Sequence, residues 1–259
     1  MTLTLLAFIA GSVVATFHMP FWWNTPSLGE VSLGDTLGWT GAVGVQLAAF
    51  ALVTAVTWWI ERRPGGARES RTPPLRGWAR ALRGPWPLLA GGAVLAVLNA
   101  LTLVLAGHPW GITWAFALWG AKALQAVGYD LSMVPFWRGE FQQAALAAPV
   151  LADVTSVMDL GIILGALLAA GLAGRFAPVR RVPLGIVAAS VLGGLLLGYG
   201  ARLAYGCNIG AYFSGIASTS LHGWLWFVAA LAGNALGTRI RPWFGLTVER
   251  TFCDPSSEC

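Results

Sequence analysis

Residues 184–219 read LGIVAASVLGGLLLGYGARLAYGCNIGAYFSGIAST, and the change of pattern within this stretch decides the fold class. Its first part, 184–205, is apolar and long enough for a transmembrane helix, which needs about 20 residues. The second part, 208–219, is also apolar but too short to cross a bilayer. The stretch therefore predicts a membrane-spanning helix followed by a re-entrant half-helix, which enters the membrane and leaves on the same side.

The rest of the chain has the composition of an integral membrane protein. Of 259 residues, 56% are hydrophobic and only 10% are charged, and the mean hydropathy is +0.67. A soluble domain carries about 25% charged residues. The alternating pattern of a membrane β-barrel is absent, so the predicted fold is all-α and polytopic. Further spans are predicted at 1–17, 39–60, 84–106, 156–173 and 221–238, and a shorter helical piece at 142–152.

The arginines predict how the chain is oriented. Most of them lie in 61–83, 174–183 and 239–259, between or after the apolar runs. Positive charge collects in short loops on the cytoplasmic side of a membrane. The net charge of +5 therefore reflects topology, and no nucleic-acid partner is predicted. The loop 18–38 has acidic residues but no lysine or arginine, so we place it outside.

This topology predicts a second re-entrant segment. Because 84–106 leaves the cytoplasm and 156–173 returns to it, residues 107–127 are expected to enter and leave the membrane on the outer face. The motifs at 107–111 (GHPWG) and 206–210 (GCNIG) both follow a long span and have glycines four apart. Matched, interrupted apolar segments point to the binding site of a transporter. The alternative is that the glycines only let helices pack closely.

The predicted spans, the arginine-rich loops and the two motifs together divide the chain into four parts. Two helices and an arginine-rich loop occupy 1–83, and a first repeat with the GHPWG motif occupies 84–173. A second repeat with the GCNIG motif occupies 184–241, followed by a cytoplasmic tail at 242–259. The sequence thus predicts a polytopic helical membrane protein with re-entrant half-helices and an internal repeat.

Charged residues within apolar segments are rare and usually functional. Two roles are open for Arg202: attracting an anion, or pairing with an acid such as Asp159 to hold helices together. Lys122, the only lysine, has the same two roles open, and its long side chain can also reach the interface. Asp153 and Asp159 lie at the start of a span, where acids favour the positive end of the helix dipole. Asp153 is predicted to cap that helix.

Cys207 is the sharpest candidate for a functional residue. A free cysteine is often only a small buried hydrophobe, but Cys207 lies between glycines, beside Asn208, at the predicted turn. Backbone N–H groups at such a turn suit an anion. The thiol is a weak donor and acceptor, which suits a soft sulfur atom. His108 holds the matching place in the other motif, as a ligand or a structural group, and His222 is expected to anchor the interface.

Other chemistry is not indicated. Cys253 and Cys259 lie in the polar tail TFCDPSSEC, and three cysteines make no disulfide framework. No metal, Walker or dinucleotide motif occurs, so no metal, cofactor or enzymatic activity is predicted. The candidate substrate contacts are Cys207, Arg202, Gly206, Asn208, Gly210, His108 and Lys122.

The stretch GGLLLGYGARLAYGCNIGAYFSGIASTSLHGWLWF resembles the signature of the YeeE/YedE membrane proteins, a sulphur-transport family whose characterised members take up thiosulfate. PWGITWAFALWGAK and DVTSVMDLGIILGALLAAG are similar to the same family, so the resemblance covers about 84–245. It implies a permease in a bacterial inner membrane for a small sulfur-containing anion. It also implies that Cys207 matches a pore cysteine that hydrogen-bonds to sulfur, and that a cytoplasmic sulfur carrier of the TusA type is a possible partner.

The chain departs from the family pattern in its cysteines. The Arg-x-x-x-Cys-Phe element and the second Gly-Gly-Cys motif of the family do not occur, so a relay of three cysteines is not expected. Many relatives are longer, which leaves open that this chain is part of a larger assembly. Two other functions also stay open: a membrane scaffold that docks a soluble sulfur or selenium carrier, and a membrane thiol enzyme that uses Cys207.

Overall fold

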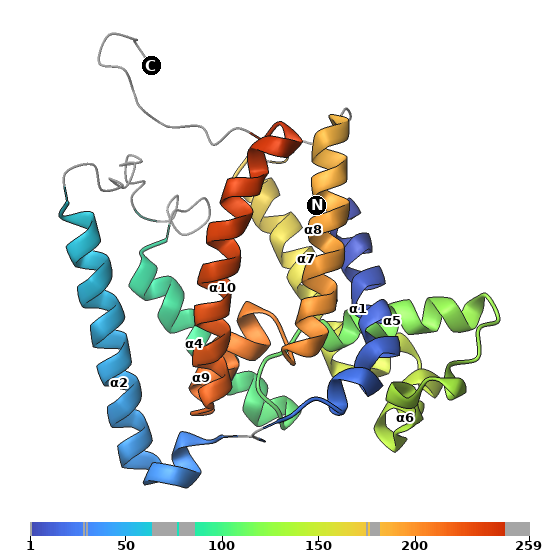
Figure 1. Cartoon of the computed structure of the whole chain (residues 1–259), viewed down its shortest axis with the longest axis horizontal. Coiled ribbons are helices and arrows are strands. Elements are labelled where there is room, and N and C mark those ends of the chain that lie inside the picture. Colours follow the sequence, from blue (N-terminus) through green and yellow to red (C-terminus); the bar gives the residue numbers. More distant parts are fainter. Residues whose placement is uncertain are drawn as a thin grey trace.

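The described part of the chain is built from helices and turns (Figure 1). It contains no strand, apart from an isolated bridge between Ser32 and Ser220. The predicted all-α class is therefore confirmed. The computed structural model describes residues 2–27, 29, 31–63, 77, 86–174, 176 and 182–246.

Five of the helices are long and apolar enough to cross a membrane, which establishes a multi-pass membrane protein. They match five predicted spans, although the first helix continues through Pro20 well beyond the predicted 1–17. The sixth predicted span is helix α10 (Leu221–Ile240), which is as long but more polar and is not among the five. The five are α1 (Thr2–Trp23), α2 (Leu33–Glu61), α4 (Leu88–Ala106), α7 (Val154–Leu172) and α8 (Leu184–Leu203).

Short helices occupy both regions where re-entrant segments are predicted. The first region holds α5 (Thr113–Ala126), whose axis lies across those of α1 and α8 (Figure 1). The second holds a π-helix, η4 (Asn208–Ser214), and one turn of α-helix, α9 (Gly215–Ala217). Each of these helices is shorter than the about 20 residues that a membrane span needs. The remaining short elements are η1 (Leu131–Met133), η2 (Pro135–Arg138), α6 (Glu140–Ala147), η3 (Val150–Ala152) and η5 (Arg241–Phe244).

Helices α1 and α8 pack closely because glycines line their contact. A Cβ atom at Gly198 would overlap the backbone carbonyl of Phe8, and one at Gly194 would lie 2.6 Å from the Cβ of Ala7. Small residues let membrane helices approach in this way. The glycines of α8 therefore fix the position of the segment that follows it.

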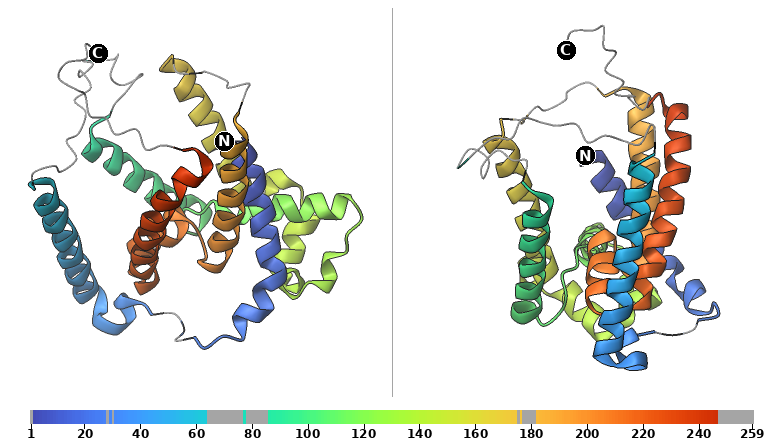
Figure 2. Two further views of the ribbon diagram at one scale, coloured as in Figure 1. Left: turned by 45° about the horizontal axis from the view of Figure 1, so that its top comes forward. Right: turned by 90° about the vertical axis from the view of Figure 1, so that its left-hand side faces the viewer.

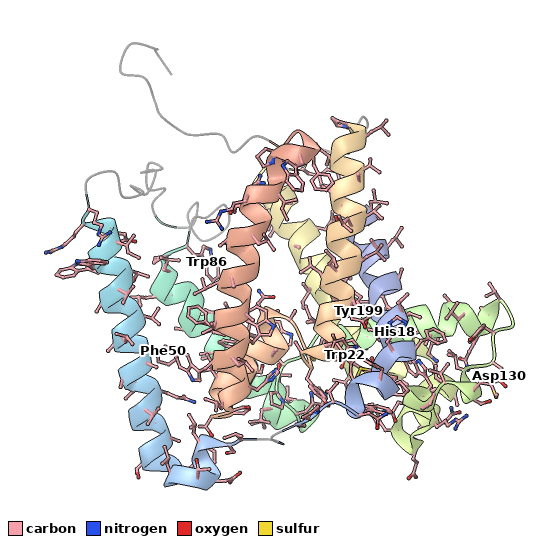
Figure 3. The ribbon with its side chains drawn as sticks, in the orientation of Figure 1. His18, Trp22, Phe50, Trp86, Asp130 and Tyr199 are labelled. Atoms are coloured by element: carbon pink, nitrogen blue, oxygen red, sulfur yellow. The ribbon has the colours of Figure 1, made fainter. Side chains whose placement is uncertain are left out.

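Polar side chains also join α1 to α8. The Tyr199 hydroxyl accepts a hydrogen bond from Trp22 Nε1 at 2.9 Å and lies 3.2 Å from His18 Nδ1 (Figure 3). Tyr199 lies one turn before Arg202, near the end of α8. These contacts hold the C-terminal end of α8 against α1.

The helices form two layers with short elements between them. Seen from the side, α4 and α7 lie in one layer, and α2, α8 and α10 lie in the other (Figure 2). The most completely buried apolar cluster lies among the short elements, where Leu118, Leu131 and Trp137 are at most 1% exposed. The Trp137 indole donates to Thr16 Oγ1 of α1 at 3.1 Å. The core thus supports the short elements rather than the outer faces of the long helices.

Candidate functional site

The chain reverses sharply after α8. Tyr205 and Gly206 both have positive φ values, of 54° and 155°, and the Gly206 N–H donates to the carbonyl of Ala201 at 2.9 Å. A Cβ atom at Gly206 would lie only 2.6 Å from the backbone nitrogen of Ala211. Glycine is therefore required here, both for its conformation and for the close approach of the next segment.

Cys207 immediately precedes the π-helix that follows this turn. Its carbonyl accepts hydrogen bonds from the backbone nitrogens of Ala211 at 2.9 Å and Tyr212 at 3.3 Å. Its thiol is free and partly buried, and Asn208 is the first residue of the helix. A short helix is thus present at this place, in the π rather than the α form, and its re-entrant course stays a prediction. The π form is rare overall and is often found at functional sites.

The two glycine motifs meet in space. Ser214 Oγ, at the end of η4, donates to the carbonyl of Trp110 at 2.8 Å. The Trp110 N–H donates to Asn99 Oδ1 at 3.0 Å, and Ser214 Oγ lies 3.4 Å from the same oxygen. A Cβ atom at Gly210 would lie 3.9 Å from the Cα of Gly111. We call these residues the motif junction.

Asn99 and Ser214 belong to this junction but lie outside the two motifs, and neither was predicted from the sequence. Asn99 could have been found. The available signal was an amide side chain in the middle of the apolar helix LLAGGAVLAVLNALTLVLA. Polar groups inside membrane helices form hydrogen bonds between segments. Beside the junction lies a mostly apolar hollow of about 320 Å³, lined by Ala96, Asn99, Ala100, Leu103, Pro109, Phe213, Ala217 and Ser218.

Arg202 is buried without a carboxylate partner. It is 8% exposed, its NH1 atom has no hydrogen-bond partner, and its guanidinium carbon lies 5.7 Å from the ring centroid of Phe136. That distance allows a cation–π interaction. The ion pair with Asp159, one of its two open roles, does not form: both Asp159 oxygens also lack a hydrogen-bond partner. The positive charge of Arg202 is therefore not neutralised by a described residue.

Lys122 has a structural contact instead. Its Nζ atom donates to the carbonyl of Leu146 at 2.7 Å and to that of Ala148 at 2.6 Å. These carbonyls lie at the end of α6, where the last carbonyls of a helix have no intrahelical partner. Lys122 thus stabilises the C-terminus of α6, and no contact joins it to the motif junction.

The two histidines differ in their contacts. His108 is exposed, and its Nδ1 lies 3.0 Å from the carbonyl of Pro109 in its own loop. His222, expected as an interfacial anchor, lies with Nε2 2.8 Å from the carbonyl of Ala204. His222 therefore ties the start of α10 to the end of α8, just before the turn at Gly206.

Asp153 caps α7 as predicted. Its Oδ2 accepts from the backbone nitrogen of Ser156 at 2.7 Å, and its Oδ1 accepts from the indole of Trp114 at 3.0 Å. Asp159 does not cap a helix but lies within α7, 1% exposed.

Several predictions fall outside the described residues. Cys253 and Cys259 lie there, as do most of the arginines of 61–83. Among the described arginines, Arg62 and Arg63 stack on the rings of Trp58 and Trp59 at the end of α2, at 3.5 and 3.6 Å from the ring centroids. Which loops face the cytoplasm and which face outside stays a prediction, and so does the internal repeat.

The fold and the motif junction define a polytopic helical membrane protein in which interrupted segments meet between the spans. The chain belongs to the Sulphur transport family, which it matches over residues 1–236.

Named relatives support this placement. The chain is 31% identical to the probable transporter YedE of Escherichia coli (strain K12) over 157 residues, covering 60% of this chain and 37% of the relative. It is 35% identical to the YedE of Salmonella typhimurium (strain LT2) over 151 residues, covering 57% and 36%. It is 28% identical to the thiosulfate transporter TsuA of Spirochaeta thermophila over 232 residues, covering 79% and 68%. The chain thus spans little more than a third of the YedE relatives. No solved structure matches it significantly.

Proposed function

We propose that this protein is a permease that carries a small sulfur-containing anion, with thiosulfate the first candidate, across a bacterial inner membrane. The observation that carries the proposal is the motif junction, where two interrupted apolar segments are joined through Asn99, Trp110 and Ser214. Interrupted segments that meet in this way are how many transporters build a site within the bilayer. The name of the TsuA relative supports thiosulfate as the substrate.

The residues at the end of α8 and at the turn that follows it suit the two ends of thiosulfate. An anion is costly within a membrane unless positive charge or donors compensate it. Arg202, which no described carboxylate neutralises, and the first backbone N–H groups of η4, which have no partner within the helix, would attract the oxygen-bearing end. The free thiol of Cys207 would contact the terminal sulfur, because a thiol is a weak donor that suits a soft acceptor.

The test is uptake of radiolabelled thiosulfate by proteoliposomes that contain the purified full chain, with and without Cys207→Ala. Loss of the thiol contact, worth about 1 kcal/mol, is expected to reduce uptake about fivefold. Cys253→Ala is the matched control, because it removes a cysteine from the polar tail, and its uptake is expected to equal that of the wild type. Wild-type uptake by a correctly folded Cys207→Ala variant would contradict the role of the thiol.

The scaffold hypothesis and the TusA-type partner depend on the arginine-rich segments. These segments lie largely outside the described residues, so no described contact favours the scaffold over the permease. The two are separated by the same uptake assay: a scaffold binds a soluble carrier protein but moves no thiosulfate into liposomes.

A further inference from the structure

A line of polar side chains runs along the first turns of α7, at Asp153, Ser156 and Asp159. Residues three apart are neighbours on a helix surface, so each lies about 4.5 Å further along the axis than the one before. The first two are bonded to α5: Trp114 Nε1 donates to Asp153 Oδ1 at 3.0 Å, and Trp119 Nε1 donates to Ser156 Oγ at 2.8 Å. The third has no such bond.

The Asp159 carboxyl is buried without any hydrogen bond. The residue is 1% exposed, and neither carboxyl oxygen has a hydrogen-bond partner. An ionised carboxylate in an apolar interior carries a large free-energy cost unless a positive charge or donors compensate it. The Asp159 carboxyl is therefore neutral in this arrangement, with a proton on one oxygen.

No positive charge compensates Asp159 from the elements that pack most closely against α7, which are α5 and η3. The only titratable group on α5 is Lys122, and its ammonium group donates to two backbone carbonyls at the end of α6. The segment η3 (VLA) carries no titratable group. On α7 itself, Asp153 is a second acid, and neighbouring acids disfavour each other's ionised forms. Arg202 on α8 makes no ion pair with Asp159.

The chemistry of this site favours a proton over a metal cation. Hard metal cations need several oxygen ligands. The part of the chain that the structure describes contains no group of three or more His, Cys, Asp or Glu side chains that could hold a metal. The nearest polar side chain along the line, Ser156, is already bonded to Trp119. A single carboxyl is sufficient for a proton.

We infer that Asp159 binds a proton that enters together with the transported anion. The inference rests on the proposed function. Asp159 takes up a proton from water on one side of the membrane and releases it to water on the other. One proton moves inward in total, and no other bond changes.

A coupled proton has a clear physical use. Thiosulfate carries two negative charges, and the membrane potential of a bacterial cell, negative inside, opposes its entry. Each proton that enters with the anion offsets one of these charges. Acidic side chains within membrane helices carry protons in other pumps and transporters.

The test uses the purified full chain in proteoliposomes that contain a pH-sensitive dye and have their membrane potential clamped. Sodium thiosulfate is added outside, and both lumenal pH and radiolabelled uptake are followed. The wild type is expected to acidify the lumen, and an inward proton gradient is expected to increase its uptake. In Asp159→Asn the acidification is expected to fall to the protein-free background. Asp130→Asn is the matched control, because Asp130 is an exposed acid that caps η1, and it should acidify the lumen as the wild type does.

The outcomes separate the inference from the proposed function. Wild-type uptake without acidification, or uptake that responds only to a sodium gradient, would overturn the proton site and leave the permease intact. Acidification by a folded Asp159→Asn variant would also overturn it. No uptake by the folded wild type under any gradient would overturn the permease and the proton site with it. If Asp159→Asn does not fold, the response of the wild type to the proton gradient decides the question.

Discussion

Arg202 and Lys122 are both cations within apolar segments, but their surroundings give them different roles. The Lys122 ammonium group donates to two carbonyls at the end of α6, so its donors are used within the fold. Arg202 makes no ion pair with a described residue, and its guanidinium carbon lies 5.7 Å from the ring centroid of Phe136. Of the two cations, Arg202 is therefore the one whose donors are not all used within the described part of the fold.

Gly206 sets the direction of the π-helix, and its replacement is expected to be costly. The positive φ of 155° and the 2.6 Å approach of the Ala211 nitrogen leave no room for a Cβ atom. Gly206→Ala is expected to destabilise the protein by about 1–3 kcal/mol, the usual cost of a strained backbone conformation. Thermal unfolding in detergent measures this change.

Gly200→Ala provides the comparison, because nothing lies within 4 Å of a Cβ atom at Gly200 on α8. Alanine favours a helix over glycine, so this variant is expected to unfold at the wild-type temperature or slightly above it. Equal unfolding temperatures for Gly206→Ala and Gly200→Ala would contradict the close approach at the turn.

At the scale of elements, the sequence predicted where short helices occur but not their form. Apolar length alone separates 208–219 from a span, which is why the half-helix could be predicted. The π-helix could not, because hydrophobic periodicity separates helix from strand but gives no distinct signal for the wider π turn. The two motifs were predicted to be a matched pair of segments. Their contact was not predicted, and neither was the role of Asn99, which accepts a hydrogen bond from Trp110 of the first motif.

Asn99 links α4 to both motifs, so its removal is expected to loosen the junction. Asn99→Leu leaves the N–H of Trp110 without its acceptor, and the loss is expected to be about 1–3 kcal/mol of stability. Thr102→Val is the control on the same helix, because Thr102 bonds only to the carbonyl of Leu98 within α4. Thermal unfolding of both variants is the measurement, and an equal effect of the two would argue against the junction.

At the scale of the whole molecule, the spans were predictable and their arrangement was not. Long apolar runs identified α2, α4, α7 and α8 to within a few residues. The pairing of α1 with α8 depends on where glycines face a neighbouring backbone, as at Gly198, and a single sequence does not show which helix that neighbour is. Whether Arg202 pairs with Asp159 likewise depends on how two helices are oriented, which the sequence does not show. In the structure the two residues do not form an ion pair.

The two layers are joined mainly through the short elements. Helix α5 contacts α1, α7 and α8, and Asn99 of α4 reaches the loop before α5 and the end of η4. Helix α2 is attached through the Gln46 amide, which donates to the carbonyl of Ile216 at 2.9 Å, and through the ring of Phe50 against Trp224 (Figure 3). The regions predicted to be re-entrant thus connect the two layers in the described part of the chain.

The most direct test of the permease is uptake by the wild-type chain alone. Purified, correctly folded protein is reconstituted into liposomes, and the initial rate of radiolabelled thiosulfate entry is compared with that of protein-free liposomes. A permease is expected to give entry that saturates with thiosulfate concentration and falls when unlabelled thiosulfate is added. Entry at the protein-free rate, with the protein folded and inserted, would contradict the proposed permease.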